Sequence, residues 1–220
     1  MGAVVDLLNV LLEPTAVFER VRERPRFLAP FLALAAITVV ILALQLPYTR
    51  AALAAQFAQT PNMTPEQAQA GMKFAPIGIV IAPILYALFL LLDAFILWVG
   101  VSVLGGEARY KTLLSVTTYA AITYALLQVV GLIVLMLRGP GSVASMVDLQ
   151  PALGLDLLVS DAQGFTLALL RGLNPFTLYG LFLTAVGVAV THKISKGTAY
   201  AVATVQFVIA WLIGAVLSKG

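Results

Sequence analysis

The sequence predicts an all-α membrane protein: a bundle of five transmembrane helices, with amphipathic helices at the membrane surfaces. Composition is the first observation, because 61% of the 220 residues are hydrophobic and 10% are charged, against about 25% charged in a soluble domain. The mean hydropathy of +1.00 is the second. The third is a set of five apolar segments near the roughly 20 residues that a helix needs to cross a bilayer. No segment alternates apolar and polar residues over barrel lengths, so strands are not expected.

Residues 1–26 precede the first span and are expected to form a cytoplasmic amphipathic segment. Apolar residues recur there at helical spacing and are opposed by Asp6, which predicts a helix lying on the inner membrane surface. Pro14 is expected to begin a second short helix. The apolar residues of the first helix are Val4, Leu7, Leu8, Leu11 and Leu12.

Residues 27–217 are expected to form a single transmembrane domain. The second span is long enough to tilt or to project beyond the hydrocarbon core, and Pro83 is expected to kink it. The fourth span is expected to begin at Pro175, with Asn174 as its N-cap. The five predicted spans are 27–46, 76–104, 113–137, 175–191 and 197–217.

Two of the connections between spans have recognisable sequence patterns. The letters TPEQ at residues 64–67 form a capping-box pattern, which predicts a short surface helix over residues 65–73. The longest loop runs from Arg138 to Gly164 and combines Gly and Pro with apolar residues able to enter the membrane interface.

The basic residues predict the orientation of the chain. With the N-terminus inside, eight Lys and Arg residues lie on the cytoplasmic side and five on the other side. Because cytoplasmic loops carry the excess of positive charge, we expect the N-terminus inside and the C-terminus outside. The inside set is Arg20, Arg22, Arg24, Arg26, Arg109, Lys111, Lys193 and Lys196, and the outside set is Arg50, Lys73, Arg138, Arg171 and Lys219.

One carboxylate, Asp93, lies inside the apolar run FLLLDAFILW. A charged Asp at the bilayer centre costs about 2.5 to 3.5 kcal/mol or more, so we expect it to face the bundle interior, neutral or paired. It lies about 16 Å from the inner end of its helix, counting 1.5 Å per residue. The same depth on three other helices falls near Thr38, Tyr124 and Gln206, which predicts an intramembrane polar site of these four residues.

Two interpretations of this polar site remain open. A protonated Asp93 can join helices by hydrogen bonds. Alternatively, an intramembrane acid can respond to protons or cations in a transporter or channel.

Small residues recur on one face of the fourth and fifth spans. Such faces let helices approach closely, which favours packing within the bundle and leaves self-association as the alternative. The residues predicted to pack are Gly180, Thr184, Gly187, Ala199, Ala203 and Gly214.

Four arginines, Arg20, Arg22, Arg24 and Arg26, follow the amphipathic segment and are expected to meet lipid headgroups at the inner surface. The same charges also serve the positive-inside pattern, and Glu19 and Glu23 dilute them. Positive charge on this scale does not indicate a nucleic-acid partner, since the net charge is only +3.

No pattern for enzymatic chemistry is present. The chain has no Cys and one His, His192, and lacks the HExxH, GxSxG and P-loop motifs. We therefore expect no enzyme, no catalytic residues, no metal site and no cofactor.

Three segments resemble the Yip1 domain family. The segment LLEPTAVFERVRERPRFLAP is similar to the family's leading segment, and GGEARYKTLLSVTTYA, residues 105–120, resembles its turn into the third helix. The segment LNPFTLYGLFLTAVGVAVTHKISKGTAYAV, residues 173–202, resembles its fourth helix and the following turn. Their order and spacing cover most of the chain, and the resemblance implies a five-helix membrane domain with a cytoplasmic N-terminus.

The resemblance also bears on partners and location. Eukaryotic members act in vesicle traffic with Rab-type small GTPases and sister proteins, through a longer hydrophilic N-terminal region. Since about 26 residues precede the first span here, small-GTPase binding is not expected. The composition, rich in Ala, Leu, Val and Arg, indicates a bacterial member located in the inner membrane.

Two classes of function are compatible with these observations. The first is a scaffold or interaction protein that organises lipids, copies of itself or other membrane proteins. The second is a small ion- or proton-linked transporter or channel that uses Asp93. Replacing Asp93 by Asn separates them, because Asn keeps hydrogen bonding and removes titration.

Overall fold

The structure is a computed structural model that describes residues 2–104, 106–159 and 161–217. Within these ranges every regular element is a helix, and five helical stretches are long and apolar enough to cross a membrane. The predicted fold class is thereby confirmed. The spanning stretches are α3 (Leu28–Gln59), α5 (Ile77–Val103), the pair α6 (Tyr110–Ala120) and α7 (Ile122–Arg138), α9 (Pro175–His192) and α10 (Lys196–Leu217).

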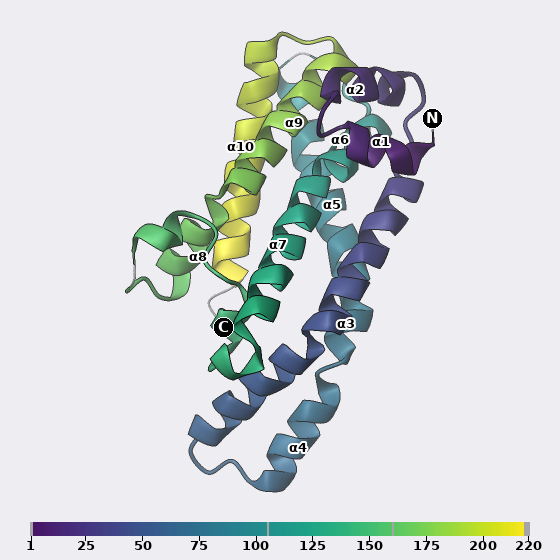
Figure 1. Cartoon of the computed structure of the whole chain (residues 1–220). Coiled ribbons are helices and arrows are strands. Elements are labelled where there is room, and N and C mark those ends of the chain that lie inside the picture. The colour runs from purple at the N-terminus through teal and green to yellow at the C-terminus, as the bar shows by residue number, and fades with distance from the viewer. Residues whose placement is uncertain (1, 105, 160, 218–220) are drawn as a thin grey trace.

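The shorter elements gather at the two ends of the bundle (Figure 1). One end, here named the α1–α2 end, contains α1 (Ala3–Asn9) and α2 (Pro14–Glu23). The opposite half, here named the α4–α8 end, has α4 at the far tip and a loop with three short 3-10 helices before α8, which lies beside α10. The elements of that second end are α4 (Pro65–Phe74), η1 (Pro140–Ser142), η2 (Met146–Leu149), η3 (Leu155–Leu158) and α8 (Gly164–Gly172).

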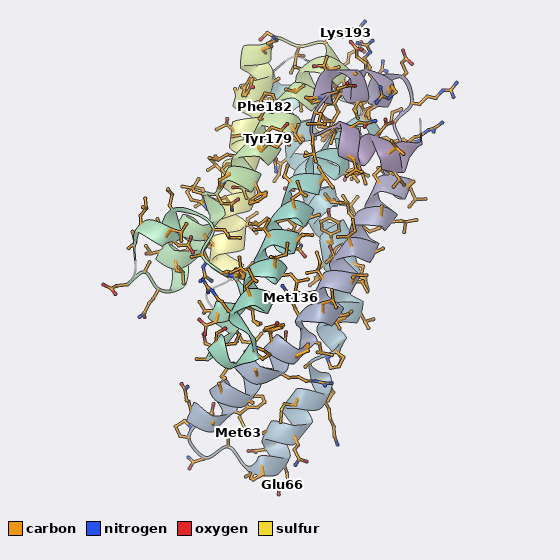
Figure 2. All side chains as sticks on the ribbon, in the orientation of Figure 1. Met63, Glu66, Met136, Tyr179, Phe182 and Lys193 are labelled. Carbon is orange, nitrogen blue, oxygen red and sulfur yellow. The ribbon has the colours of Figure 1, made fainter. Side chains whose placement is uncertain are left out.

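The first spanning helix is longer than the sequence indicated. The predicted span 27–46 is the first part of α3, which continues through Pro47 to Gln59. Alanine-rich sequence after Pro47 has high helix propensity, which offsets the backbone hydrogen bond that the proline removes. The end of α3 and all of α4 therefore project from the bundle, with Met63 and Glu66 at the tip (Figure 2).

The third span is interrupted at Ala121, where α6 ends and α7 begins. No proline causes this break. Instead, three threonine hydroxyls around it donate to backbone carbonyls: Thr117 and Thr118 to Leu114, at 3.0 and 2.6 Å, and Thr123 to Ala120, at 3.0 Å. Hydroxyls that bond back to the preceding turn commonly bend helices.

The loop at the α4–α8 end is ordered around Gly154. A Cβ at this position would meet the carbonyl oxygens of Leu170 and Leu173 at 2.8 Å, so only glycine fits. Asp156 then accepts from Arg171 Nε at 3.0 Å and joins η3 to α8. Trp211 Nε1 donates to a carbonyl of α8 at 3.1 Å, which fastens the loop to α10.

The largest hydrophobic cluster lies at the α1–α2 end, where both short helices contribute to it. Phe18 of α2, Leu97 of α5, Leu113 of α6 and Leu183 of α9 are fully buried there. Two smaller clusters lie elsewhere, around Tyr48 and around Leu90 with Ala94 and Leu114. The segment before the first span is thus part of the folded core.

Candidate functional site

The α1–α2 unit is docked on the bundle mainly through α2. Val17, Phe18 and Val21 are buried and pack on α9. Phe18 lies directly over Gly187, where a Cβ would come within 3.0 Å of the ring and 2.5 Å of Val116. Gly187 is therefore required for the close approach of α2, α6 and α9.

Polar contacts fasten the same unit at three points. Arg20 Nη2 lies 2.6 Å from Asp6 Oδ1, which joins α2 to α1. The Tyr119 hydroxyl donates to the Ala3 carbonyl at 3.2 Å, and the Tyr179 hydroxyl donates to the Leu11 carbonyl. The hydrogen bond with Asp6 raises the pKa of the Arg20 guanidinium further above its high ordinary value, so this group stays charged.

The orientation of α1 differs from the predicted one. Asp6 was expected on the polar side, yet it is buried, as is Leu7 beside it. Apolar residues lie on almost every side of α1, so their spacing did not determine which face of the helix packs on the bundle. Pairing with Arg20 makes the inward placement of Asp6 favourable. Val4, Val5, Leu8 and Leu12 point outward instead, and Leu12 is 87% exposed. These four residues, three on α1 and Leu12 in the turn after it, are named the α1 apolar face.

The four arginines differ in their surroundings. Arg20 is bound to Asp6, and Arg22 lines a hollow between helix ends. Arg24 and Arg26 are exposed near the start of the first span. The pairing of Arg20 with Asp6 was not predicted, and contact of the four arginines with lipid headgroups stays a prediction.

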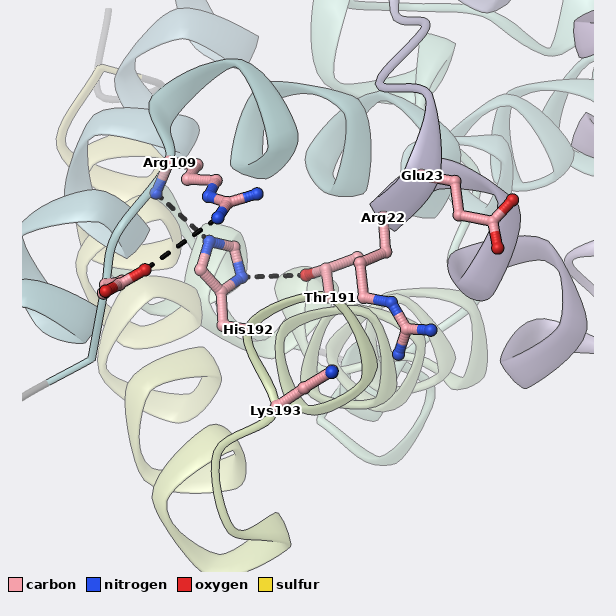
Figure 3. A pocket seen from close by; sticks show the side chains of 7 residues that line it. Arg22, Glu23, Arg109, Thr191, His192 and Lys193 are labelled. Carbon is pink, nitrogen blue, oxygen red and sulfur yellow. Dashed lines mark hydrogen bonds and ion pairs between the residues drawn. The ribbon is translucent and has the colours of Figure 1, made fainter.

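The hollow, named the helix-end hollow, has a volume of about 460 Å³ (Figure 3). Three separate segments form it: the end of α2, the turn between α5 and α6, and the end of α9. Its walls combine charges of both signs with two neutral polar side chains. The lining residues are Arg22, Glu23, Glu107, Arg109, Thr191, His192 and Lys193.

His192 connects the walls of this hollow. Its Nε2 accepts from the Arg109 backbone N–H at 3.2 Å, and its Nδ1 lies 2.8 Å from Thr191 Oγ1. Thr191 Oγ1 lies 2.6 Å from the Gly187 carbonyl and donates its proton there. Nδ1 must then be the donor to Thr191, so the ring is neutral with the proton on Nδ1. This contact was not predicted from the sequence, because the partner turn is distant along the chain.

The predicted intramembrane polar site is partly assembled. Asp93 of α5 interacts with the Gln206 amide of α10. Thr38 is buried on α3, whereas Tyr124 is 50% exposed on α7 and interacts with Gln128. Counting residues from helix ends gave the depth of these side chains but not the direction in which each points.

Tyr86 is a member of this site that the sequence analysis missed. It lies within electrostatic range of both Asp93 and Tyr124, and its ring stacks on Phe31 with centroids 6.0 Å apart. Tyr86 precedes Asp93 by seven residues, which places both on one helix face two turns apart. That spacing was the signal available in the sequence.

The small-residue faces pack mostly within the bundle. A Cβ on Gly180 would lie 2.7 Å from Thr123 Oγ1 of α7. Thr184, Ala199 and Ala203 are buried. Gly214 differs from the prediction: it is exposed, and a Cβ there would meet nothing within 4 Å. Near the end of α10 the neighbouring Ala215 turns inward in its place.

Comparison with known proteins agrees with this architecture. The chain is 29% identical over 216 aligned residues to the membrane protein YknW of Bacillus subtilis (strain 168), covering 92% of this chain and 85% of that relative. No solved structure matches the chain. The family described as Yip1 domain matches residues 8–218, so the chain belongs to the Yip1 domain family.

Proposed function

We propose that this chain is a non-enzymatic protein of the bacterial inner membrane that organises lipids or partner proteins through its cytoplasmic α1–α2 end. The distribution of charge supports this orientation. Eight Lys and Arg residues belong to the α1–α2 end. Four described ones belong to the opposite half, and Lys219 lies outside the described residues. The excess of positive charge is typical of a cytoplasmic side.

The observation that carries the proposal is the α1 apolar face. Leu8 is 64% exposed and Leu12 is 87% exposed, although α1 itself is fixed by the Asp6–Arg20 pair and by two tyrosine hydroxyls. A rigidly held apolar surface beside the start of α3 is suited to contact with lipid or with another protein. Fixed docking presents that surface in one orientation instead of leaving it on a mobile tail.

A cysteine accessibility experiment tests this proposal, because the chain has no native Cys. In the Leu12→Cys variant, the cysteine would be labelled with an environment-sensitive fluorophore. The labelled protein would be studied in inside-out membrane vesicles, whose cytoplasmic face is accessible to the quencher. Glu19→Cys, at an exposed position of α2, is the matched control. We expect iodide to quench the label at residue 19 and to quench the label at residue 12 several-fold less. Equal quenching at both positions would show that nothing covers the α1 apolar face and would overturn the proposal.

A second candidate function is proton- or cation-linked transport, favoured by the contact of Asp93 with Gln206 beside Tyr86. Intramembrane acids with polar partners recur in ion pathways. The test is ion and proton flux in proteoliposomes across a pH range, with wild type beside Asp93→Asn. Flux above empty liposomes that disappears in the variant would make Asp93 a transport residue. No flux in folded protein would leave it as a hydrogen-bonding group between α5 and α10.

A further inference from the structure

The helix-end hollow has the volume of a small-ligand site. Its volume of about 460 Å³ falls within the range of about 300 to 1,000 Å³ that is common for such sites. Residues from α2, from the turn before α6 and from the end of α9 converge on it. His192 holds two of these segments together, so the walls keep a defined spacing (Figure 3).

Three cations face the hollow and are weakly neutralised. Arg109 has one carboxylate partner, Glu107, at 3.9 Å, and both side chains are largely exposed. In the described part of the chain, no ion pair involves Arg22 or Lys193. Guanidinium groups recognise phosphate by paired hydrogen bonds, and an ammonium adds a point charge.

The side chains of the neutral walls, Thr191 and His192, have no free hydrogen-bond donor for a phosphate oxygen. Both ring nitrogens of His192 are used, and the Thr191 hydroxyl both donates and accepts. Recognition in the hollow therefore falls to the charged groups. Three cations and two carboxylates, Glu23 and Glu107, leave a net charge of 3 − 2 = +1.

Lys193 has an unusual backbone for its side chain. It ends α9 with φ 53° and ψ 34°, a left-handed conformation that glycine usually provides after a helix. The position is a lysine here, and its side chain lines the hollow. The lysine at this turn therefore adds a positive charge to the hollow at a position where the backbone favours glycine.

We propose that the helix-end hollow binds a single phosphate group, carried either by a lipid headgroup or by a small soluble phosphate compound. Arg22 and Arg109 would hold its oxygens from two sides, and Lys193 would supply charge at the end of α9. The net charge of +1 suits one phosphate monoanion or diester and disfavours polyphosphates. The hollow is separate from the α1 apolar face, so this site does not depend on what covers that face.

Calorimetric titration of the whole protein in an uncharged detergent tests the site with two probes. These are inorganic phosphate and a short-chain phosphatidylglycerol. Binding of inorganic phosphate would assign the site to a soluble compound, whereas binding of the lipid alone would assign it to a headgroup. Binding of neither probe at millimolar concentration would overturn the proposal.

Variants that remove single charges test whether phosphate binds in the helix-end hollow. Arg22→Gln, Arg109→Gln and Lys193→Gln are each expected to weaken binding about tenfold, since each removes a charge-assisted contact. Lys196→Gln removes the same charge at the same end from an exposed residue outside the lining, and it should change affinity less than twofold. A loss in Lys196→Gln as large as in Lys193→Gln would show a general charge effect and would overturn the site.

A variant that binds phosphate more tightly provides a control, because misfolding can weaken binding but cannot strengthen it. Glu107→Gln removes the carboxylate that competes for Arg109. We expect binding to tighten by about twofold to fivefold, as the release of an exposed ion pair allows. Weaker binding in this variant would show that Arg109 does not hold the phosphate and would contradict the proposed geometry.

Discussion

The two ends of the molecule each contain a short amphipathic helix adjacent to α3 in the sequence, yet the two helices are held by different means. At the α1–α2 end, α2 has no side-chain cap but buries Val17, Phe18 and Val21. At the α4–α8 end, α4 has a complete capping box and buries none of its residues. One helix depends on contacts with distant parts of the chain, and the other depends on hydrogen bonds within four residues. Long-range packing therefore fixes the N-terminal surface, while the opposite projection is stabilised locally.

The largest expected effect is that of Phe18→Ala. Loss of this fully buried ring should lower the free energy of unfolding of the α1–α2 unit by about 3 to 5 kcal/mol. Hydrogen exchange of α1 and α2 amides in detergent would measure it. Phe57→Ala in the projection, where the ring lies against Gly71, should cost about 1 kcal/mol. Equal losses in the free energy of unfolding for Phe18→Ala and Phe57→Ala would contradict the difference between the two ends.

Gly187→Ala is expected to have the next largest effect. The added methyl would overlap Val116 and the Phe18 ring, with an expected cost of about 1 to 3 kcal/mol. Thermal unfolding in detergent is the measurement. Gly214→Ala adds the same methyl to open space and should not lower the melting temperature, because the added methyl meets no atom and alanine raises the helix propensity of α10 by up to about 1 kcal/mol.

Asp6→Asn should have a smaller effect. It breaks the pair with Arg20, whose side chain is 40% exposed, so we expect a loss of about 1 to 2 kcal/mol. Limited proteolysis near α1 would report the loosened unit. In a double-mutant cycle with Arg20→Gln, independent contributions from the two residues would show that the pair does not fasten α1.

Thr64→Ala is expected to have the smallest and most local effect. Loss of the N-cap costs about 1 kcal/mol of helix stability, confined to α4. Exchange of the first α4 amides should accelerate about fivefold, with no change in the core of the bundle. Faster exchange in α9 or α10 would show that α4 is coupled to the bundle and is not an independent local element.

Local signals explain what could be predicted from the sequence. The Thr64 capping box and the Asn174 cap were both found from short motifs, and the structure confirms both helix starts. The composition and apolar run lengths similarly determined the fold class. Counting from helix ends put Asp93 and Gln206 at one depth, and their side chains interact in the structure.

The features that could not be predicted depend on distant partners. The inward turn of Asp6 depends on Arg20, and the role of His192 depends on the Arg109 turn. The break at Ala121 arises from threonine hydroxyls whose bonding direction the sequence does not reveal. In each case the residue type was visible, but the helix face on which its partner would lie was not.

The length of α3 sets how far the chain projects from the bundle. The 13 residues from Pro47 to Gln59 extend about 20 Å past the predicted end of the first span. Arg50 lies early in this stretch and resists entry into hydrocarbon, so a thicker bilayer cannot draw the helix in without cost. We therefore expect the tip at Met63 and Glu66, at the end of the projection in Figure 2, to stay outside the hydrocarbon. Neighbouring membrane proteins with tall domains on that side would meet α4 before they reach the bundle.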